Sequence, residues 1–144
     1  MKPVVDRWRK AIRKAKATTM FKRAVLENRQ LILDSNIAQL QIGIDSFGQF
    51  LREYASDAYA HFKQEHGSRA PFGIADLKLT GDFHSGFVLK YTGGEFVITS
   101  TDSKTDDLVA KYGKDIFGLA NESIEDIRPH LQASFIKLFR NELL

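Results

Sequence analysis

The clearest hydrophobic pattern in the chain lies in residues 87–99, where two short runs of β-forming residues flank a pair of glycines. Phe87–Tyr91 and Glu95–Thr99 are rich in aromatic and β-branched side chains, which favour strands. Gly93 and Gly94 can take the positive φ angles that a tight hairpin turn needs. The pattern therefore predicts an antiparallel β-hairpin.

Helical periodicity dominates the first 33 residues. Apolar residues recur there at spacings of three and four, at Val5, Trp8, Ile12 and Ala15. This spacing predicts an amphipathic helix over residues 4–17. Thr18-Thr19 indicates a break, after which the helical pattern continues to about residue 33. We expect a basic N-terminal helical arm over residues 1–33 and a single α+β domain over residues 34–144.

The middle of the chain shows shorter patterns. Alternation over Ile37–Ile42 predicts a strand, and Gln49–Tyr54 either returns as its partner or begins a helix. Apolar residues on one side of Ala55–Glu65 predict a helix that ends near Gly67. Gly67–Gly73 is the most loop-like stretch of the chain, and it predicts a surface loop or a segment that orders against a neighbour.

The last third of the chain predicts helices. Asp106–Tyr112 forms a short helix that Gly113 ends, and Asn121 caps a further helix. Pro129 is expected to interrupt that helix and to begin the last one. An apolar stripe follows at Leu131, Phe135, Leu138 and Phe139, and it is expected to pack across the hairpin. Helices combined with an antiparallel hairpin indicate an α+β fold.

Charge is unevenly distributed. Residues 1–30 hold ten basic and two acidic residues, a net charge of +8, whereas the remainder holds eleven basic and sixteen acidic residues, a net charge of −5. This asymmetry predicts that the arm meets something negative, such as nucleic acid, a membrane surface or an acidic neighbouring subunit. The alternative is one long helix with a solvated basic face. The residues proposed to face a partner or DNA are Arg7, Trp8, Lys10, Ile12, Arg13 and Lys14.

Candidate chemistry is sparse. The chain has no cysteine, which excludes disulfides and thiolate sites, and no apolar run near the roughly 20 residues of a membrane span. The histidines match no metal motif, and no phosphate-binding loop or nucleophile elbow is present. Asp82 and His84 form one conceivable acid–base pair, but as a pair they would need burial and a pocket. We therefore expect no enzyme, no cofactor and no metal.

The half of the chain from about Asp76 onward resembles the tail-completion and head–tail joining (neck) proteins of tailed bacteriophages. Those proteins carry a Leu-x-x-Thr-Gly hook, two strands joined by a tight turn, a segment ending in glycine and an Arg-Pro-x-Leu helix. The matching positions are Leu77, Thr80, Gly81, Phe83, Ser85, Gly86, Gly113, Arg128, Pro129 and Leu131. The long basic arm and the insert at residues 114–119 depart from the family pattern.

The resemblance implies a structural virion protein that is assembled in the host bacterial cytoplasm. It implies a homo-oligomeric ring that contacts portal, connector or tail proteins, with DNA passing through its lumen and no membrane. Heterologous contacts repeated around an axis close into such a ring. The expected assembly loop contains Ser68, Arg69, Pro71 and Phe72. The alternatives are a nucleic-acid-binding accessory protein that uses the basic helix and a small hydrolase that uses Asp82 and His84.

Overall fold

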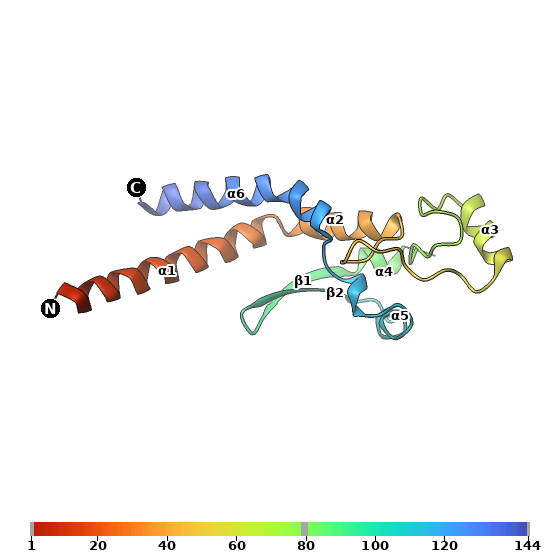
Figure 1. Cartoon of the computed structure of the whole chain (residues 1–144), viewed down its shortest axis with the longest axis horizontal. Coiled ribbons are helices and arrows are strands. Elements are labelled where there is room, and N and C mark those ends of the chain that lie inside the picture. Colours follow the sequence, from red (N-terminus) through yellow and green to blue (C-terminus); the bar gives the residue numbers. More distant parts are fainter. Residues whose placement is uncertain (1, 79–80, 144) are drawn as a thin grey trace. The chain divides into compact units, whose positions relative to one another are not determined.

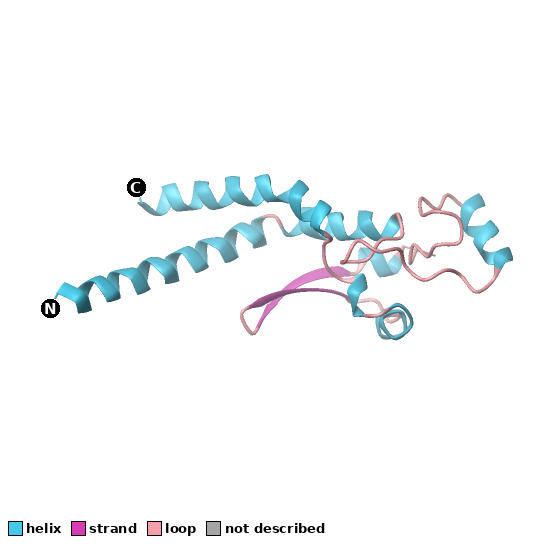
Figure 2. Cartoon of the chain, viewed as in Figure 1, coloured by secondary structure: helices cyan, strands magenta, loops and turns pink. Residues whose placement is uncertain are grey.

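The computed structural model describes residues 2–78 and 81–143 (Figure 1). In order, its elements are α1 (Lys2–Glu27), α2 (Arg29–Gln41), α3 (Asp57–Glu65), α4 (Asp82–Ser85), β1 (Phe87–Thr92), β2 (Glu95–Ser100), α5 (Thr105–Tyr112), the 3-10 helix η1 (Lys114–Ile116) and α6 (Asn121–Leu143). Helices are combined with an antiparallel hairpin, which confirms the α+β class (Figure 2).

The chain forms two compact units. Residues 1–30 and 127–144 make up the helical unit, and residues 31–126 make up the mixed unit. Helix α6 begins in the mixed unit and continues into the helical unit. Residues 1–30 of the expected arm therefore share a unit with the C-terminal part of the chain.

In the helical unit, α1 packs against α6. Met20 and Ala24 of α1 are buried together with Leu138 of α6, and Phe135 covers them. Ala24 is completely buried at this point. The second half of α1 is therefore part of a hydrophobic core rather than a free arm.

The predicted break at Thr18-Thr19 is wrong, because α1 continues through it. The Thr18 hydroxyl donates a hydrogen bond to the Lys14 carbonyl (2.9 Å), which satisfies the side chain within the helix. The break falls at Asn28 instead. Its side-chain amide donates to the Ala24 carbonyl and to the Ser134 hydroxyl, at 2.8 Å each. These bonds fix the end of α1 to α6.

The strand predicted at Ile37–Ile42 is also wrong, because residues 37–41 belong to α2. The buried residues of α2 recur at helical rather than alternating spacing, at Ile32, Leu33, Asn36, Gln39 and Leu40. Gln49–Tyr54 is not a full partner strand. It contributes only two isolated bridges among the described residues, Ile44 with Phe50 and Glu53 with Ile74.

Two buried polar residues of α2 hold the segment that leads into α6. The Asn36 amide donates to the Ile116 carbonyl (3.1 Å) and its oxygen accepts from the Gly118 N–H (2.9 Å). The Gln39 amide donates to the Gly118 carbonyl (3.0 Å), and its oxygen accepts from the Ala120 N–H (2.8 Å). Because these backbone groups lie in an irregular segment, the two side chains replace the hydrogen bonds that secondary structure would supply.

The predicted hairpin is confirmed. Phe87 pairs with Ser100 at one end of the ladder and Thr92 with Glu95 at the other. Gly93 (φ 60°) and Gly94 (φ 82°) form the turn. Phe87 anchors the hairpin in the core of the mixed unit, where its ring lies 5.1 Å from that of Phe83 and 5.3 Å from that of Phe117.

The local helix signals were correct for α3 and α5 but not for Pro129. Gly67 follows the end of α3 (φ 86°), and Gly113 ends α5 (φ 89°). Pro129, however, lies inside α6, which is continuous from Asn121 to Leu143. Proline removes one backbone hydrogen bond. The buried Ile127 and Leu138 on either side of it keep the helix packed despite this loss.

Candidate functional site

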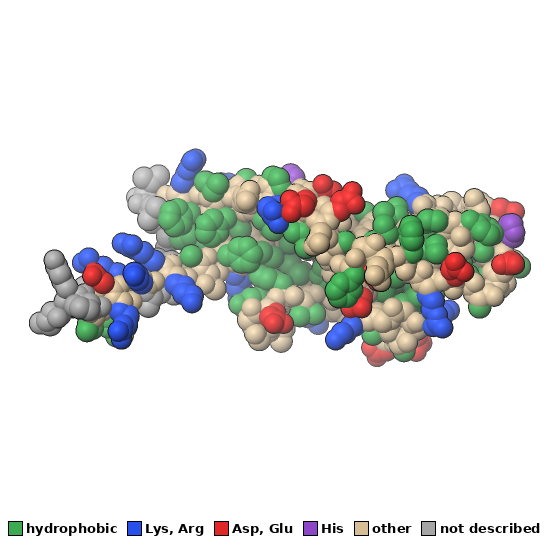
Figure 3. Space-filling model, in the orientation of Figure 1, with side chains coloured by type: hydrophobic (Ala, Val, Ile, Leu, Met, Phe, Trp, Pro, Cys, Tyr) green, Lys and Arg blue, Asp and Glu red, His purple; other side chains and the backbone are tan. Residues whose placement is uncertain are grey.

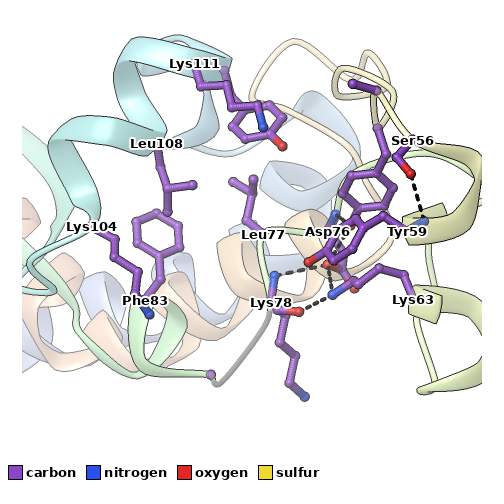
Figure 4. A pocket seen from close by; sticks show the side chains of 14 residues that line it. Ser56, Tyr59, Lys63, Asp76, Leu77, Lys78, Phe83, Lys104, Leu108 and Lys111 are labelled. Carbon is purple, nitrogen blue, oxygen red and sulfur yellow. Dashed lines mark hydrogen bonds and ion pairs between the residues drawn. The ribbon is translucent and has the colours of Figure 1, made fainter.

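A cavity of about 430 Å³ opens in the mixed unit between α5, α3 and the segment that holds Asp76 (Figure 4). Leu77, Phe83 and Leu108 give it an apolar floor. The rings of Tyr54, Tyr59 and Tyr112 form much of its wall, and the Tyr54 and Tyr59 rings meet edge to face at 4.9 Å. This combination suits an apolar or aromatic group.

A buried ion pair forms one side of the cavity. The Lys63 ammonium lies 2.8 Å from Asp76 Oδ1, and the two side chains are only 9% and 5% exposed. Lys63 also donates to the Lys78 carbonyl. Asp76 accepts further hydrogen bonds from the Ser68 hydroxyl (3.0 Å), the Lys78 N–H (3.0 Å) and the Tyr54 hydroxyl (3.3 Å). Both charges are therefore compensated within the protein.

These contacts shift two ionisation equilibria. Burial by itself would raise the pKa of Asp76, but the hydrogen bonds from Lys63 and Lys78, the charge of Lys63 and the Ser68 hydroxyl outweigh it, so the pKa lies below its ordinary value. Burial, followed by the negative charge of Asp76, raises the pKa of Tyr54 well above its ordinary value. Asp76 is therefore held as a carboxylate and Tyr54 as a neutral phenol.

Leu77, next to the ion pair, has a positive φ angle of 57°. This conformation is costly for a residue with a side chain, by about 1–3 kcal/mol. The hydrogen bonds of Asp76 to Lys63 and to the Lys78 N–H hold the backbone on both sides of it. The strained backbone places Leu77 in the floor of the cavity.

The opposite side of the cavity is cationic. Lys104 and Lys111 extend from the two ends of α5, and the Lys111 ammonium lies 5.4 Å from the centre of the Tyr112 ring (Figure 4). The described lining contains four lysines and one carboxylate, Asp76, which is already bonded to Lys63. The cavity therefore offers an apolar floor beneath a positive rim.

Asp82 and His84, the conceivable acid–base pair, do not lie in this cavity. Asp82 is exposed at the start of α4, whereas His84 is buried against the rings of Phe83 and Phe87. No residue of the described structure places a hydrogen-bonding atom in good geometry with either ring nitrogen of His84. Burial lowers the pKa of His84, although the nearby Asp76 partly opposes this shift. His84 is therefore a neutral core residue at pH 7.

The arm residues lie along the first half of α1. Arg7, Lys10, Arg13 and Lys14 are exposed there, and Lys and Arg side chains gather over this helix (Figure 3). Trp8 is 67% exposed, and Ile12 belongs to the same helix. This half of α1 thus carries positive charge together with a large exposed aromatic side chain.

The expected assembly loop is only partly free. Ser68 is bonded to Asp76, which ties the loop to the buried ion pair. Arg69, Pro71 and Phe72 are exposed, and the Phe72 ring packs 4.8 Å from that of His61. The loop therefore presents an aromatic and a cationic side chain on a fixed base.

The residues of the family-like motif do not gather at one place. Leu77, Gly81 and Phe83 line the cavity, and Ser85 lies in α4, where its hydroxyl donates to the Asp82 carbonyl (3.1 Å). Gly113 ends α5, and both Arg128 and Pro129 lie in α6. Thr80 is outside the described residues.

Sequence reasoning missed the ion pair of Lys63 and Asp76, as well as Lys104 and Lys111 at the two ends of α5. One signal was present for Lys63. It follows Ala60 by three residues and so lies on the buried side of α3, where a charged residue requires a partner. The identity of that partner, thirteen residues away, was not visible in any pattern.

Over residues 2–78 and 81–143, no three His, Asp or Glu side chains converge as a metal site would require. None of the described helices is both long and apolar enough to cross a membrane.

Comparison of the chain with protein-family models, with curated proteins and with solved structures found no match.

Proposed function

We propose that this protein is a structural virion protein of a tailed bacteriophage, part of the head–tail connector, neck or tail-completion ring, and that it is not an enzyme. The resemblance of its second half to that family is the starting point. The observation that carries the proposal is the display of large apolar side chains, Phe47, Phe50 and Phe72, on exposed turns and loops. Exposed aromatic side chains of this kind are typical of protein interfaces.

The polar network supports a structural role. Lys63, Tyr54 and Ser68 each bond to the Asp76 carboxylate, so these groups hold the fold together. A catalytic group would instead be aimed at a substrate. The cationic half of α1, with Trp8, supports contact with an acidic neighbouring subunit or with DNA in the lumen.

The direct test of this proposal is whether the protein is present in the virion. Antibodies against the protein should label the neck of purified virions of the phage that encodes it, and mass spectrometry should detect it in those virions. Its absence from purified virions would overturn the proposal.

A second experiment tests the role of α1. Removing residues 1–19 leaves Met20, Ala24 and Leu138 in place, so the shortened chain should fold. It should fail to co-purify with portal, connector or tail proteins that capture the full chain. An unfolded product would show that residues 1–19 are part of the core. A folded product that still binds those proteins would show that the arm is not the joining element.

The exposure of Arg7, Lys10, Arg13 and Lys14 favours a second candidate, a nucleic-acid-binding accessory protein. Because lysine and arginine release counterions when they bind phosphates, DNA affinity should fall steeply with salt. Replacing the four residues by glutamate should abolish it. Binding that is absent or insensitive to salt would exclude this candidate.

A further inference from the structure

A rigid aromatic knob projects from the mixed unit at residues 44–50. Phe47 at its tip is 73% exposed. The Asp45 carboxylate accepts hydrogen bonds from the N–H groups of Phe47 (2.9 Å) and Gln49 (3.0 Å). The Ser46 N–H donates to the Asp115 carbonyl (2.9 Å), which fixes the turn to the body. An aromatic side chain on a turn ordered in this way loses little entropy when it binds.

The surface beside the knob is acidic. Phe47 lines a groove of about 520 Å³ together with Ile42, which is also exposed. Glu122 and Asp126 line the same groove, and Arg69 is its one cation among the described lining residues. The knob face therefore combines apolar side chains with an excess of negative charge.

The cavity beneath α5 has the complementary character. Its floor of Leu77, Phe83 and Leu108 is apolar, and Lys104 and Lys111 provide positive charge at its rim (Figure 4). Its volume of about 430 Å³ is large enough for an aromatic side chain. No residue is shared between the described linings of the cavity and the groove, so both surfaces can be used at once.

We infer that the cavity receives the knob of a second copy of this chain. Phe47 of one copy enters the cavity of the next, and Glu122 and Asp126 face Lys104 and Lys111. This inference builds on the proposed assembly function and names the surfaces that would make the contact. The occupant is a second copy because the mixed unit itself carries the apolar group and the charges that the cavity complements.

The contact has a defined symmetry consequence. Each copy offers a knob to one neighbour and a cavity to the other, so the interface is heterologous. Repetition of such a contact produces a ring when the rotation closes and a filament when it does not. Because the facing charges are opposite, salt should weaken the assembly.

Two variants test the two surfaces separately in the full chain. Phe47→Asp removes the knob, and the double variant Lys104→Glu with Lys111→Glu reverses the rim. Sedimentation velocity should show a concentration-dependent oligomer for the wild type and a monomer of 16.3 kDa for each variant. The matched control is Val97→Asp, which places a carboxylate on a side chain of β2 that is 45% exposed and away from both surfaces, and it should assemble like the wild type.

Mixing the two non-assembling variants is the decisive measurement. The Phe47→Asp chain keeps an intact cavity and the double variant keeps an intact knob, so the mixture should form a species of two chains and grow no further. Circular dichroism of each variant checks that it is folded. A wild type that stays monomeric at every concentration, or a mixture that stays monomeric, would overturn the head-to-tail contact.

Sedimentation and virion detection test the knob-and-cavity contact and the assembly role separately. Variants that still form the wild-type oligomer would overturn the knob-and-cavity contact, while detection of the protein in virions would continue to support the assembly role. Absence from virions would overturn the assembly role whatever the sedimentation result.

Discussion

Lys63 and Asp76 form a buried ion pair in which the ammonium and a carboxylate oxygen are 2.8 Å apart. Lys63 comes from α3, whereas Asp76 precedes the strained Leu77, so the pair joins a helix to the wall of the cavity. Ser68, in the loop after α3, and Tyr54, in the segment before α3, bond to the same carboxylate. These bonds attach both segments to Asp76. One carboxylate therefore organises most of this side of the mixed unit.

Removing one partner of this pair should be strongly destabilising. Asp76→Asn leaves the Lys63 ammonium buried without a counter-charge, which typically costs about 3–5 kcal/mol. Urea denaturation would measure the free energy of unfolding. The control is Glu65→Gln, which removes an exposed carboxylate from α3, the helix that carries Lys63. It should change the free energy of unfolding by less than about 0.5 kcal/mol. Equal stability of the two variants would show that the pair contributes little.

Stability should depend on pH through His84. Burial lowers its pKa in the folded state below the ordinary value of 6.5, so the unfolded chain binds the proton more readily. The contribution of neutral His84 to the free energy of unfolding is therefore fully present above pH 6.5. It is lost as the pH falls below that value. Thermal unfolding between pH 7.5 and 5 should show this loss for the wild type, and His84→Leu should reduce the slope. An unchanged slope would assign the pH dependence to other groups.

Asp76 should produce a second, more acidic transition. Its pKa is lowered in the folded state, so its stabilising contribution is present above the unfolded value of 3.8 and disappears as the pH falls through the folded value. Asp76→Asn should lack this acid transition when unfolding is followed from pH 5 to pH 2. Retention of the transition in the variant would show that other carboxylates cause it.

The buried side chain of Asn36 should contribute strongly to the stability of the fold, although it is polar. Asn36→Ala leaves the Gly118 N–H and the Ile116 carbonyl without their partner in a buried site, at a cost of about 1–3 kcal/mol for each unsatisfied group. Ser35→Ala is the neighbouring control, since the Ser35 hydroxyl donates to the Leu31 carbonyl within the same helix (2.8 Å). Chemical denaturation should separate the two variants clearly, and a loss no larger than that of the control would contradict the role of Asn36.

Two glycines with similar φ angles should respond differently to alanine. Gly43 has a φ of 81°, and an added Cβ would lie 2.5 Å from Cγ2 of Ile74. Gly73 has a φ of 85° but open space around it. Gly73→Ala should therefore cost only the backbone strain, about 1–2 kcal/mol, and Gly43→Ala should cost more because of the added overlap. Equal melting temperatures for the two variants would contradict this difference.

The local elements could be predicted wherever a short stretch carried its own signal. The hairpin required only the runs on either side of Gly93 and Gly94, and the ends of α3 and α5 required only Gly67 and Gly113. Ile37–Ile42 was different. Its alternation of apolar and polar residues matched a strand, but burial of Asn36 and Gln39 made the helical spacing the relevant one. Polar residues are assigned to solvent by default, so this burial was not visible in the sequence.

The sequence by itself determined the α+β class, the hairpin and its turn, the helices that glycine ends, and the basic character of α1, because each depends on neighbouring residues only. Tertiary structure alone decided the rest. The bonds of Asn36 and Gln39 to residues 116–120 span about eighty positions, and the cavity gathers side chains from Tyr54 to Tyr112. The reason is physical: a buried charge or amide is tolerated only where distant backbone and side-chain groups satisfy it, and no local pattern records which groups those are.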